Sequence, residues 1–216
     1  EIVSNFVSSF LSNGKEIVEN LCKQIGRPIS QCPGEMKGFE ERANYMIENA
    51  DRALEDILSK KDKEFHNYVK KEPLGTIFVI APWNYPFNTS VNSIVPSLLS
   101  GNTVILKHSS QTPLCAEQLF DAANKALLPK NIFQFLHLDH SSTSRVISDS
   151  RINHVLFTGS VSGGKEVKKS IGTRFIGAGL ELGGKDPAYV RSDCNLEYSI
   201  ENLVDGSYFN SGQSCC

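Results

Sequence analysis

The last residues of the chain place two thiols directly behind a Gly-Gln pair. Cys215 and Cys216 follow Gly212-Gln213-Ser214, and a thiolate here would be a nucleophile toward a carbonyl carbon. For an arbitrary cysteine, a small buried hydrophobic side chain is the more common role, and the pair alone leaves that alternative open. We take the pair as a candidate catalytic site.

A carboxylate precedes these thiols in an apolar, glycine-rich part of the sequence. Glu181 stands between the apolar range 175–180 and a Gly-Gly-Lys run at 183–185. We expect this carboxylate to be partly desolvated and therefore suited to act as a general base. A structural glutamate paired with a lysine or an arginine is the alternative that remains open.

A third candidate is the glycine-containing range 157–164, which is typical of a turn from a strand into a helix. Backbone N–H groups at the start of a helix attract phosphate, and the hydroxyl of Ser160 adds a donor beside Gly159. The range does not contain the G-x-G-x-x-G fingerprint, so a tight turn capped by serine explains it equally well.

The elements that must position these residues alternate between strands and helices. Short β-branched or aromatic runs occupy 76–80, 103–106, 133–136 and 154–157, and helical stretches lie near 87–100, 112–127, 142–149 and 162–172. This alternation predicts an α/β fold with a Rossmann-like parallel sheet and flanking helices. Ligands bind such sheets at the carboxyl ends of the strands, which here carry 82–84, 107–110 and 158–160.

The first sixty residues have a different texture. Residues 1–22 have a loosely helical period that is broken near Asn13-Gly14, and 35–58 reads as one long amphipathic helix. The charged run at 59–64 is expected to be a solvated boundary.

Composition narrows the classes of function. The chain has 216 residues, with 22 basic and 24 acidic side chains and a net charge of −2, which argues against a nucleic-acid or membrane partner. The six cysteines show no C-x-x-C pattern and no metal-ligand spacing with histidine, so we expect no metal. A reduced, intracellular compartment follows, with the cytoplasm expected and an organelle left open. Because the chain begins at Glu1 and ends at Cys216, we expect it to be a segment of a longer protein.

Five blocks in order resemble the NAD(P)-dependent aldehyde dehydrogenase superfamily. They are Pro82-Trp83-Asn84-Tyr85-Pro86, Lys107, Phe157-Thr158-Gly159-Ser160, the range 180–187 and the range 208–215. The resemblance covers about 35–216, and the blocks around Glu181 and Cys215 match the specific signatures of the family.

The resemblance implies roles for individual residues. Cys215 would be the nucleophile, Glu181 the base that activates water, and the amide of Asn84 a donor to the oxyanion. NAD or NADP would be held by the remaining candidates, which are Ile80, Ala81, Pro82, Trp83, Lys107, Ser110, Gly159, Ser160 and Leu182. NADP is expected to be used at least comparably, because Ser110 stands where NAD-preferring members often have a glutamate.

The resemblance also implies a division of the chain. Residues 1–182 would be a cofactor-binding domain that is incomplete at its N-terminus, with 62–77 resembling an oligomerisation strand. Residues 183–216 would begin an α/β catalytic domain, and the whole protein would be a homodimer or homotetramer.

The expected substrate is a small or polar aldehyde such as a semialdehyde. Asn88, Thr89 and Asn92 follow Asn84 at helical spacing and are predicted to line part of the substrate tunnel. Alternatives are a CoA-acylating aldehyde dehydrogenase, a catalytically inactive structural or binding homologue and, more weakly, a cysteine hydrolase. Retention of Glu181 argues against the first of these, because hydrolysis of a thioester needs a base and thiolysis does not.

Overall fold

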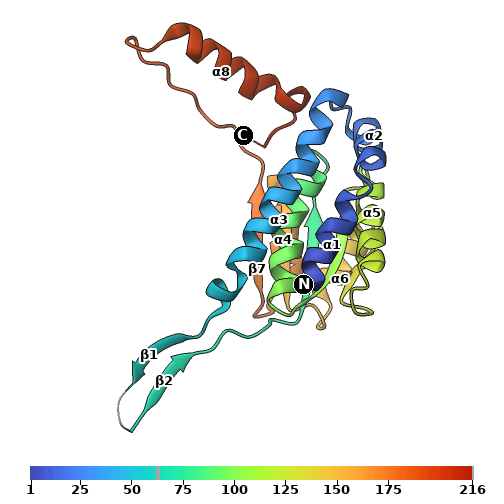
Figure 1. Cartoon of the computed structure of the whole chain (residues 1–216), viewed down its shortest axis with the longest axis vertical. Coiled ribbons are helices and arrows are strands. Elements are labelled where there is room, and N and C mark those ends of the chain that lie inside the picture. The colour runs from blue at the N-terminus through green and yellow to red at the C-terminus, as the bar shows by residue number, and fades with distance from the viewer. Residues whose placement is uncertain (62–63, 216) are drawn as a thin grey trace.

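The chain forms a five-stranded parallel sheet with helices on both faces (Figure 1), which confirms the α/β prediction. The computed structural model describes residues 1–61 and 64–215, and of residues 60 and 61 only the backbone, so Cys216 lies outside the described residues. In sheet order the strands are β5 (Phe133–Phe135), β4 (Thr103–His108), β3 (Thr76–Ala81), β6 (His154–Gly159) and β7 (Gly177–Leu182).

The register of the sheet brings separate parts of the sequence to one edge. Ile80 of β3 pairs with Lys107 of β4 on one side and with Phe157 of β6 on the other. The chain runs outward from β3 to β5 and then crosses to β6, so β3 and β6 flank the topological switch point. Open parallel sheets bind ligands at this point.

Alternate side chains of β3 pack into two separate hydrophobic cores. Ile77 and Val79 pack into the cluster on one face of the sheet, and Phe78 and Ile80 pack into the cluster on the other face. Because alternate side chains point to opposite faces, a strand buried on both faces reads as a continuous apolar run. The sheet is therefore held from both sides.

Five helices cover the first face (Figure 1). They are α1 (Ile2–Leu11), α2 (Gly14–Ile25), α3 (Cys32–Leu54), α4 (Pro86–Leu99) and α5 (Pro113–Lys125). The ring of Phe10 lies between those of Phe39 and Phe87, at centroid distances of 4.4 and 4.9 Å. Such aromatic pairs each add about 0.5–1.5 kcal/mol beyond the area they bury.

The second face carries α6 (His140–Ser148) and α7 (Val161–Ile171), which pack on each other, and α7 also packs on β6 and β7. The helix predicted at 35–58 begins earlier and ends at Leu54, because Glu55 is extended and the chain enters a hairpin at Ile57. No helix of the described chain combines the length and apolar character needed to cross a bilayer.

An antiparallel hairpin of β1 (Ile57–Lys61) and β2 (His66–Val69) projects from the body of the molecule (Figure 1). The charged run at 59–64 therefore lies partly in a strand, and residues 62 and 63 of that run fall outside the described residues. The side chains of Ile57, Leu58, Tyr68 and Val69 are exposed.

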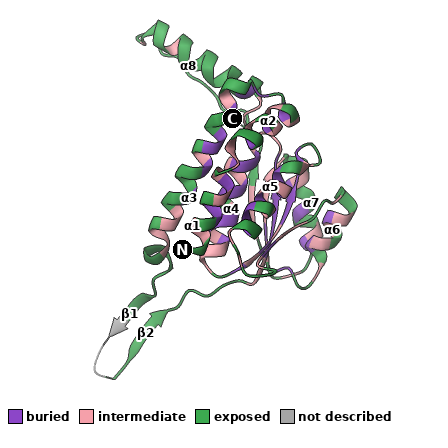
Figure 2. Ribbon diagram, turned by 45° about the vertical axis from the view of Figure 1, so that its right-hand side comes forward, coloured by how far each residue is buried: buried purple, intermediate pink, exposed green. Residues whose placement is uncertain are grey.

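The last part of the described chain contains elements that the sequence did not predict. Strand β7 occupies most of the glycine-rich stretch, and α8 (Leu196–Tyr208) follows as an exposed helix away from the sheet (Figure 2). Two short 3-10 turns, η1 (Ile29–Gln31) and η2 (Phe209–Gly212), complete the list of elements.

Candidate active site and cofactor cleft

A cleft of about 520 Å³ opens at the switch point of the sheet. It is lined by residues of β3, β4, β6, α6 and α7, namely Ile80, Lys107, His140, Ser141, Thr143, Ser144, Ile147, Phe157, Ser160, Ser162, Gly163, Glu166 and Val167. Three of the predicted cofactor residues, Ile80, Lys107 and Ser160, are therefore brought together.

Lys107 supplies the cation of the cleft. Its residue is 8% exposed, and within the described part of the chain its ammonium group has no hydrogen-bond partner. Burial lowers the pKa of this ammonium group. A buried amine without a partner has donors to offer to a ligand's hydroxyl or phosphate groups.

The start of α7 forms the other wall of the cleft. Ser160 caps the helix, since its Oγ accepts the N–H of Gly163 at 3.0 Å. A Cβ at Gly163 would lie 2.6 Å from Cζ of Phe157, and one at Gly159 would lie 2.7 Å from the same atom. The two glycines thus make room for the Phe157 ring, which leaves the helix N-terminus facing the cleft.

These features fit a dinucleotide. A helix N-terminus attracts phosphate, a free lysine suits a ribose hydroxyl or a phosphate, and the apolar side chains of Ile80 and Phe157 offer a surface for flat rings.

The other predicted cofactor residues lie outside the lining of the cleft. Ala81 and Pro82 are buried, Trp83 is half-buried against the first core, and Ser110 is exposed in the turn after β4. Leu182 packs on the first turn of α7, where a Cβ at Gly164 would meet its Cδ2 at 2.7 Å.

His108, the neighbour of Lys107, does not line the cleft. It is 2% exposed, and neither ring nitrogen has a hydrogen-bond partner. Burial, together with the charge of Lys107, lowers its pKa to about 3.

Asn84 lies beside the segment that carries the candidate nucleophile. Its Nδ2 donates to the carbonyl of Gln213 at 2.7 Å, two residues before Cys215. Next to it, the hydroxyls of Tyr85 and Ser214 are 2.9 Å apart. Because an amide nitrogen carries two hydrogens, Asn84 keeps one donor for a further acceptor.

The segments of Glu181 and Cys215 also meet. The N–H of Gly184 donates to the carbonyl of Cys215 at 2.6 Å, and Glu181 precedes Gly184 by three residues at the end of β7. The structure therefore brings the three predicted catalytic residues to one edge of the sheet.

The expected desolvation of Glu181 is wrong for the described chain. Glu181 is exposed, as is Cys215, because nothing among the described residues covers this end of β7. An apolar sequence on one side of a residue does not by itself bury it.

Sequence reasoning missed a buried ion pair behind the site. Arg27 is 2% exposed and Glu35 is 1% exposed, and their Nη1 and Oε2 atoms are 2.7 Å apart. In the sequence, Gly26-Arg27-Pro28 indicates only the end of a helix, and Gly26 is indeed the left-handed C-cap of α2. No local pattern marks the pair, because most of its partners are distant in the sequence.

The three residues predicted to line the tunnel differ in where their side chains lie. The side chain of Asn88 abuts Gly38 of α3, its backbone N–H is bonded to Glu35, and the hydroxyl of Thr89 donates to the Tyr85 carbonyl. Asn92 is exposed. The prediction that these side chains form a joint polar lining is therefore wrong for Asn88, which faces a helix of the first core.

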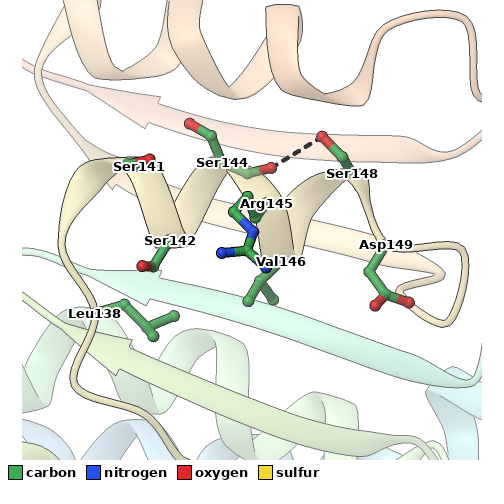
Figure 3. Close-up of a pocket in the computed structure, with 8 residues that line it drawn as sticks. All are labelled: Leu138, Ser141, Ser142, Ser144, Arg145, Val146, Ser148 and Asp149. Atoms are coloured by element: carbon green, nitrogen blue, oxygen red, sulfur yellow. Dashed lines mark hydrogen bonds between the residues drawn. The ribbon is translucent and has the colours of Figure 1, made fainter.

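A second hollow, of about 780 Å³, lies against α6 (Figure 3). Its lining comes almost wholly from that one helix, namely Leu138, Ser141, Ser142, Ser144, Arg145, Val146, Ser148 and Asp149. Among the described residues no strand end contributes to it, so the cleft at the switch point is the better candidate.

Comparison with known proteins agrees with this geometry. Residues 1–216 match the aldehyde dehydrogenase family. The succinate semialdehyde dehydrogenase [NAD(P)+] Sad of Escherichia coli is 32% identical over 206 residues, covering 94% of this chain and 44% of that protein. The D-glyceraldehyde dehydrogenase (NADP(+)) of Picrophilus torridus is 31% identical, covering 93% of this chain and 41% of that protein.

Solved structures of similar fold include an aldehyde dehydrogenase of the same kind. The succinic semialdehyde dehydrogenase of Streptococcus pyogenes, solved with NADP+, superposes with a TM-score of 0.92 at 25% identity, covering 99% of this chain and 47% of that one. The chain thus spans less than half the length of the curated relatives and solved structures named here.

Proposed function

We propose, since this chain belongs to the aldehyde dehydrogenase family, that the protein oxidises an aldehyde to a carboxylic acid with NAD or NADP. The observation that carries the proposal is the meeting of three distant segments, in which Asn84 and Gly184 are both bonded to the stretch 213–215. This meeting supports a site composed of a thiol, an amide donor and a carboxylate at one edge of the sheet.

The chain's own residues would begin the reaction at the thiol. The Cys215 thiolate attacks the aldehyde carbon, a C–S bond forms, and the carbonyl electron pair moves to the oxygen. The free N–H of Asn84 and the backbone N–H of Cys215 then hold that oxyanion. Such donors contribute about 3–4 kcal/mol each to the transition state.

When bound, NAD(P) supplies the acceptor for the hydride that leaves the carbon, so that a thioester remains on Cys215. Glu181 takes a proton from water, whose oxygen attacks the thioester carbon, and the C–S bond breaks to release the acid and the thiolate.

Lys107 and the turn at Ser160 would hold the cofactor. The partnerless ammonium of Lys107 supports binding of ribose or phosphate, and the start of α7 supports binding of the pyrophosphate. We propose that NADP is used at least comparably to NAD, which is supported by the absence of a carboxylate at Ser110 and by the cofactor names of the relatives.

The proposed substrate is a small, polar aldehyde. The names of the relatives, which specify succinate semialdehyde and D-glyceraldehyde, support this class. The proposal no longer depends on Asn88, which the structure directs toward α3.

The proposed assembly is a homodimer or homotetramer that uses the β1–β2 hairpin. Exposed apolar side chains on a projecting two-stranded hairpin support this, because such a hairpin is marginally stable alone. We also propose a reducing compartment, the cytoplasm, which the free state of the five described cysteines supports.

The test is the appearance of NADPH or NADH when the full-length protein meets succinate semialdehyde. We expect Cys215→Ser to lower the rate by at least a thousandfold and Cys216→Ser to keep most of it, because the Gly-Gln-x-Cys register selects the first thiol. Equal losses of rate in both variants would show that Cys215 is not the specific nucleophile. Oxidation that requires CoA would indicate the acylating alternative, and no oxidation of any small aldehyde would indicate an inactive homologue.

A further inference from the structure

We propose that Arg27, Glu35 and Asn210 form a buried positioning unit behind the reacting groups. This unit sets how the Asn84 amide approaches the Cys215 segment. None of the three residues lines the cofactor cleft, and the proposal rests on the proposed function. Their role would be to fix two loops that the sequence keeps far apart.

Arg27 reaches three separate segments with its guanidinium group. Its Nε donates to Oδ1 of Asn210 at 2.5 Å, its Nη1 to Glu35 at 2.7 Å, and its Nη2 to the carbonyl of Asn84 at 2.9 Å. The guanidinium plane also lies over the ring of Tyr85, 4.7 Å from the centroid. A planar fork with fixed donor directions suits such a junction, which the single ammonium of lysine does not reproduce.

Glu35 fixes the place where α4 begins. Its Oε1 accepts the N–H groups of Phe87 and Asn88 at 3.0 and 2.9 Å, and its Oε2 is bonded to Arg27. The residue at the N-cap of α4 makes no capping bond with its own side chain. The carboxylate therefore satisfies helix N–H groups that follow Asn84 by three and four residues.

Asn210 fixes the other loop. It adopts a left-handed backbone with φ of 53° and is fully buried. Its Nδ2 donates to the carbonyl of Asn84 at 3.0 Å, and its N–H donates to Oε1 of Gln31 at 3.0 Å. It stands five residues before Cys215, so the junction ties both sides of the candidate site.

The consequence is a chain of short contacts across the site. The Asn84 carbonyl accepts from both Arg27 and Asn210, and the Asn84 side chain reaches forward to Gln213. A buried ion pair is a poor source of net stability, since desolvation offsets its attraction. The role of the ion pair here is to fix the position of Asn84. Misplacing a reacting group by about 1 Å costs on the order of a hundredfold in rate.

The test compares Arg27→Lys and Asn210→Gly in the full-length enzyme. Glycine keeps the left-handed backbone at 210 and removes only the side-chain bonds. The matched control is Arg174→Lys, because Arg174 also bonds two backbone carbonyls, those of Ile147 and Ile152, but near the amino end of β6. Rapid mixing gives the first-turnover burst of NADPH, and titration gives the Kd of NADP.

We expect both site variants to slow the burst at least tenfold, or about 1.4 kcal/mol, while the Kd of NADP changes less than twofold. The double variant should be no slower than the slower single, because both remove the same junction. Arg174→Lys should lower the melting temperature without changing the burst.

A burst within twofold of wild type in folded Asn210→Gly, or additive losses in the double variant, would overturn the inference. If Arg27→Lys does not fold, Asn210→Gly decides alone. A wild-type protein that oxidises no aldehyde would instead refute the proposed function, so the two failures are distinguishable.

Discussion

Adding one methyl group at Gly163 tests how the cleft is built. The Cβ of Gly163→Ala would lie 2.6 Å from Cζ of Phe157 and 3.3 Å from the Oγ of Ser160. Ordinary contact begins near 3.4 Å, so the ring must move by about 0.8 Å. Phe157 lines the cleft, and a displaced ring would narrow it.

The magnitude follows from two opposing effects. Overpacking of this kind costs about 1–3 kcal/mol, and replacing glycine by alanine in a helix gains up to about 1 kcal/mol. We therefore expect Gly163→Ala to be neutral to about 2 kcal/mol less stable. If half of the overpacking cost, about 0.5–1.5 kcal/mol, is added in the bound state, NADP should bind about two- to tenfold more weakly.

The matched control is Gly34→Ala. Gly34 is also the third residue of its helix, and nothing lies within 4 Å of the Cβ it would gain. Calorimetric titration of NADP and urea unfolding of the full-length protein give both quantities. The control should keep the Kd of wild type and be no less stable.

A further variant separates crowding from a change in the helix itself. Phe157→Leu combined with Gly163→Ala removes the ring that the methyl group meets, and this double variant should recover stability relative to Gly163→Ala. The reasoning fails if Gly163→Ala binds NADP as tightly as wild type and gains the same stability as Gly34→Ala.

Three other predictions address the base, the cofactor and a buried histidine. Glu181→Gln should keep the first-turnover burst and slow steady turnover at least a hundredfold in rapid-mixing experiments, and an unchanged steady rate would remove Glu181 from the mechanism. Ser110→Glu should lower kcat/KM for NADP relative to NAD about fivefold or more, since an exposed carboxylate repels the 2′-phosphate by about 1 kcal/mol after screening; a ratio unchanged from wild type would contradict this. The pKa of His108 is about 3 in the folded protein, against an ordinary value of about 6.5. Between these two pH values the unfolded chain therefore binds more protons than the folded one. The free energy of unfolding should fall as the pH drops through this range, by up to about 1.4 kcal/mol per pH unit. His108→Leu should reduce this slope in urea titrations at pH 6.5 and 5.5, and equal slopes would show that another group is responsible.

The sequence predicted the elements whose pattern is local. Four of the five strands of the sheet and the four helices that follow β3, β4, β5 and β6 lie within a few residues of their expected ranges. Strand β7 was missed because its glycines have low strand propensity. The partner strand explains them, since a Cβ at Gly177 or Gly179 would lie 2.7 Å from a side chain of β6.

The residues of the site likewise fall into those with a local sequence pattern and those without one. Cys215, Glu181 and Asn84 are recognisable because each stands in a short block, whereas Arg27 bonds to residues 8, 57 and 183 positions away. A junction made of such distant partners leaves no periodicity to read. The exposure of Glu181 within the described residues was not predicted for a related reason, because exposure depends on what covers a strand end and not on the strand's own residues.

The bond between the Gly184 N–H and the Cys215 carbonyl has a topological consequence. It closes residues 184–215 into a loop that contains α8 and is pinned at both ends beside the sheet. The entropy of closing a flexible loop grows only with the logarithm of its length, about 0.6 kcal/mol for each doubling. Insertions or deletions in the excursion before α8 should therefore leave the thiol where it is, so that this stretch is free to vary in length while its two ends are not.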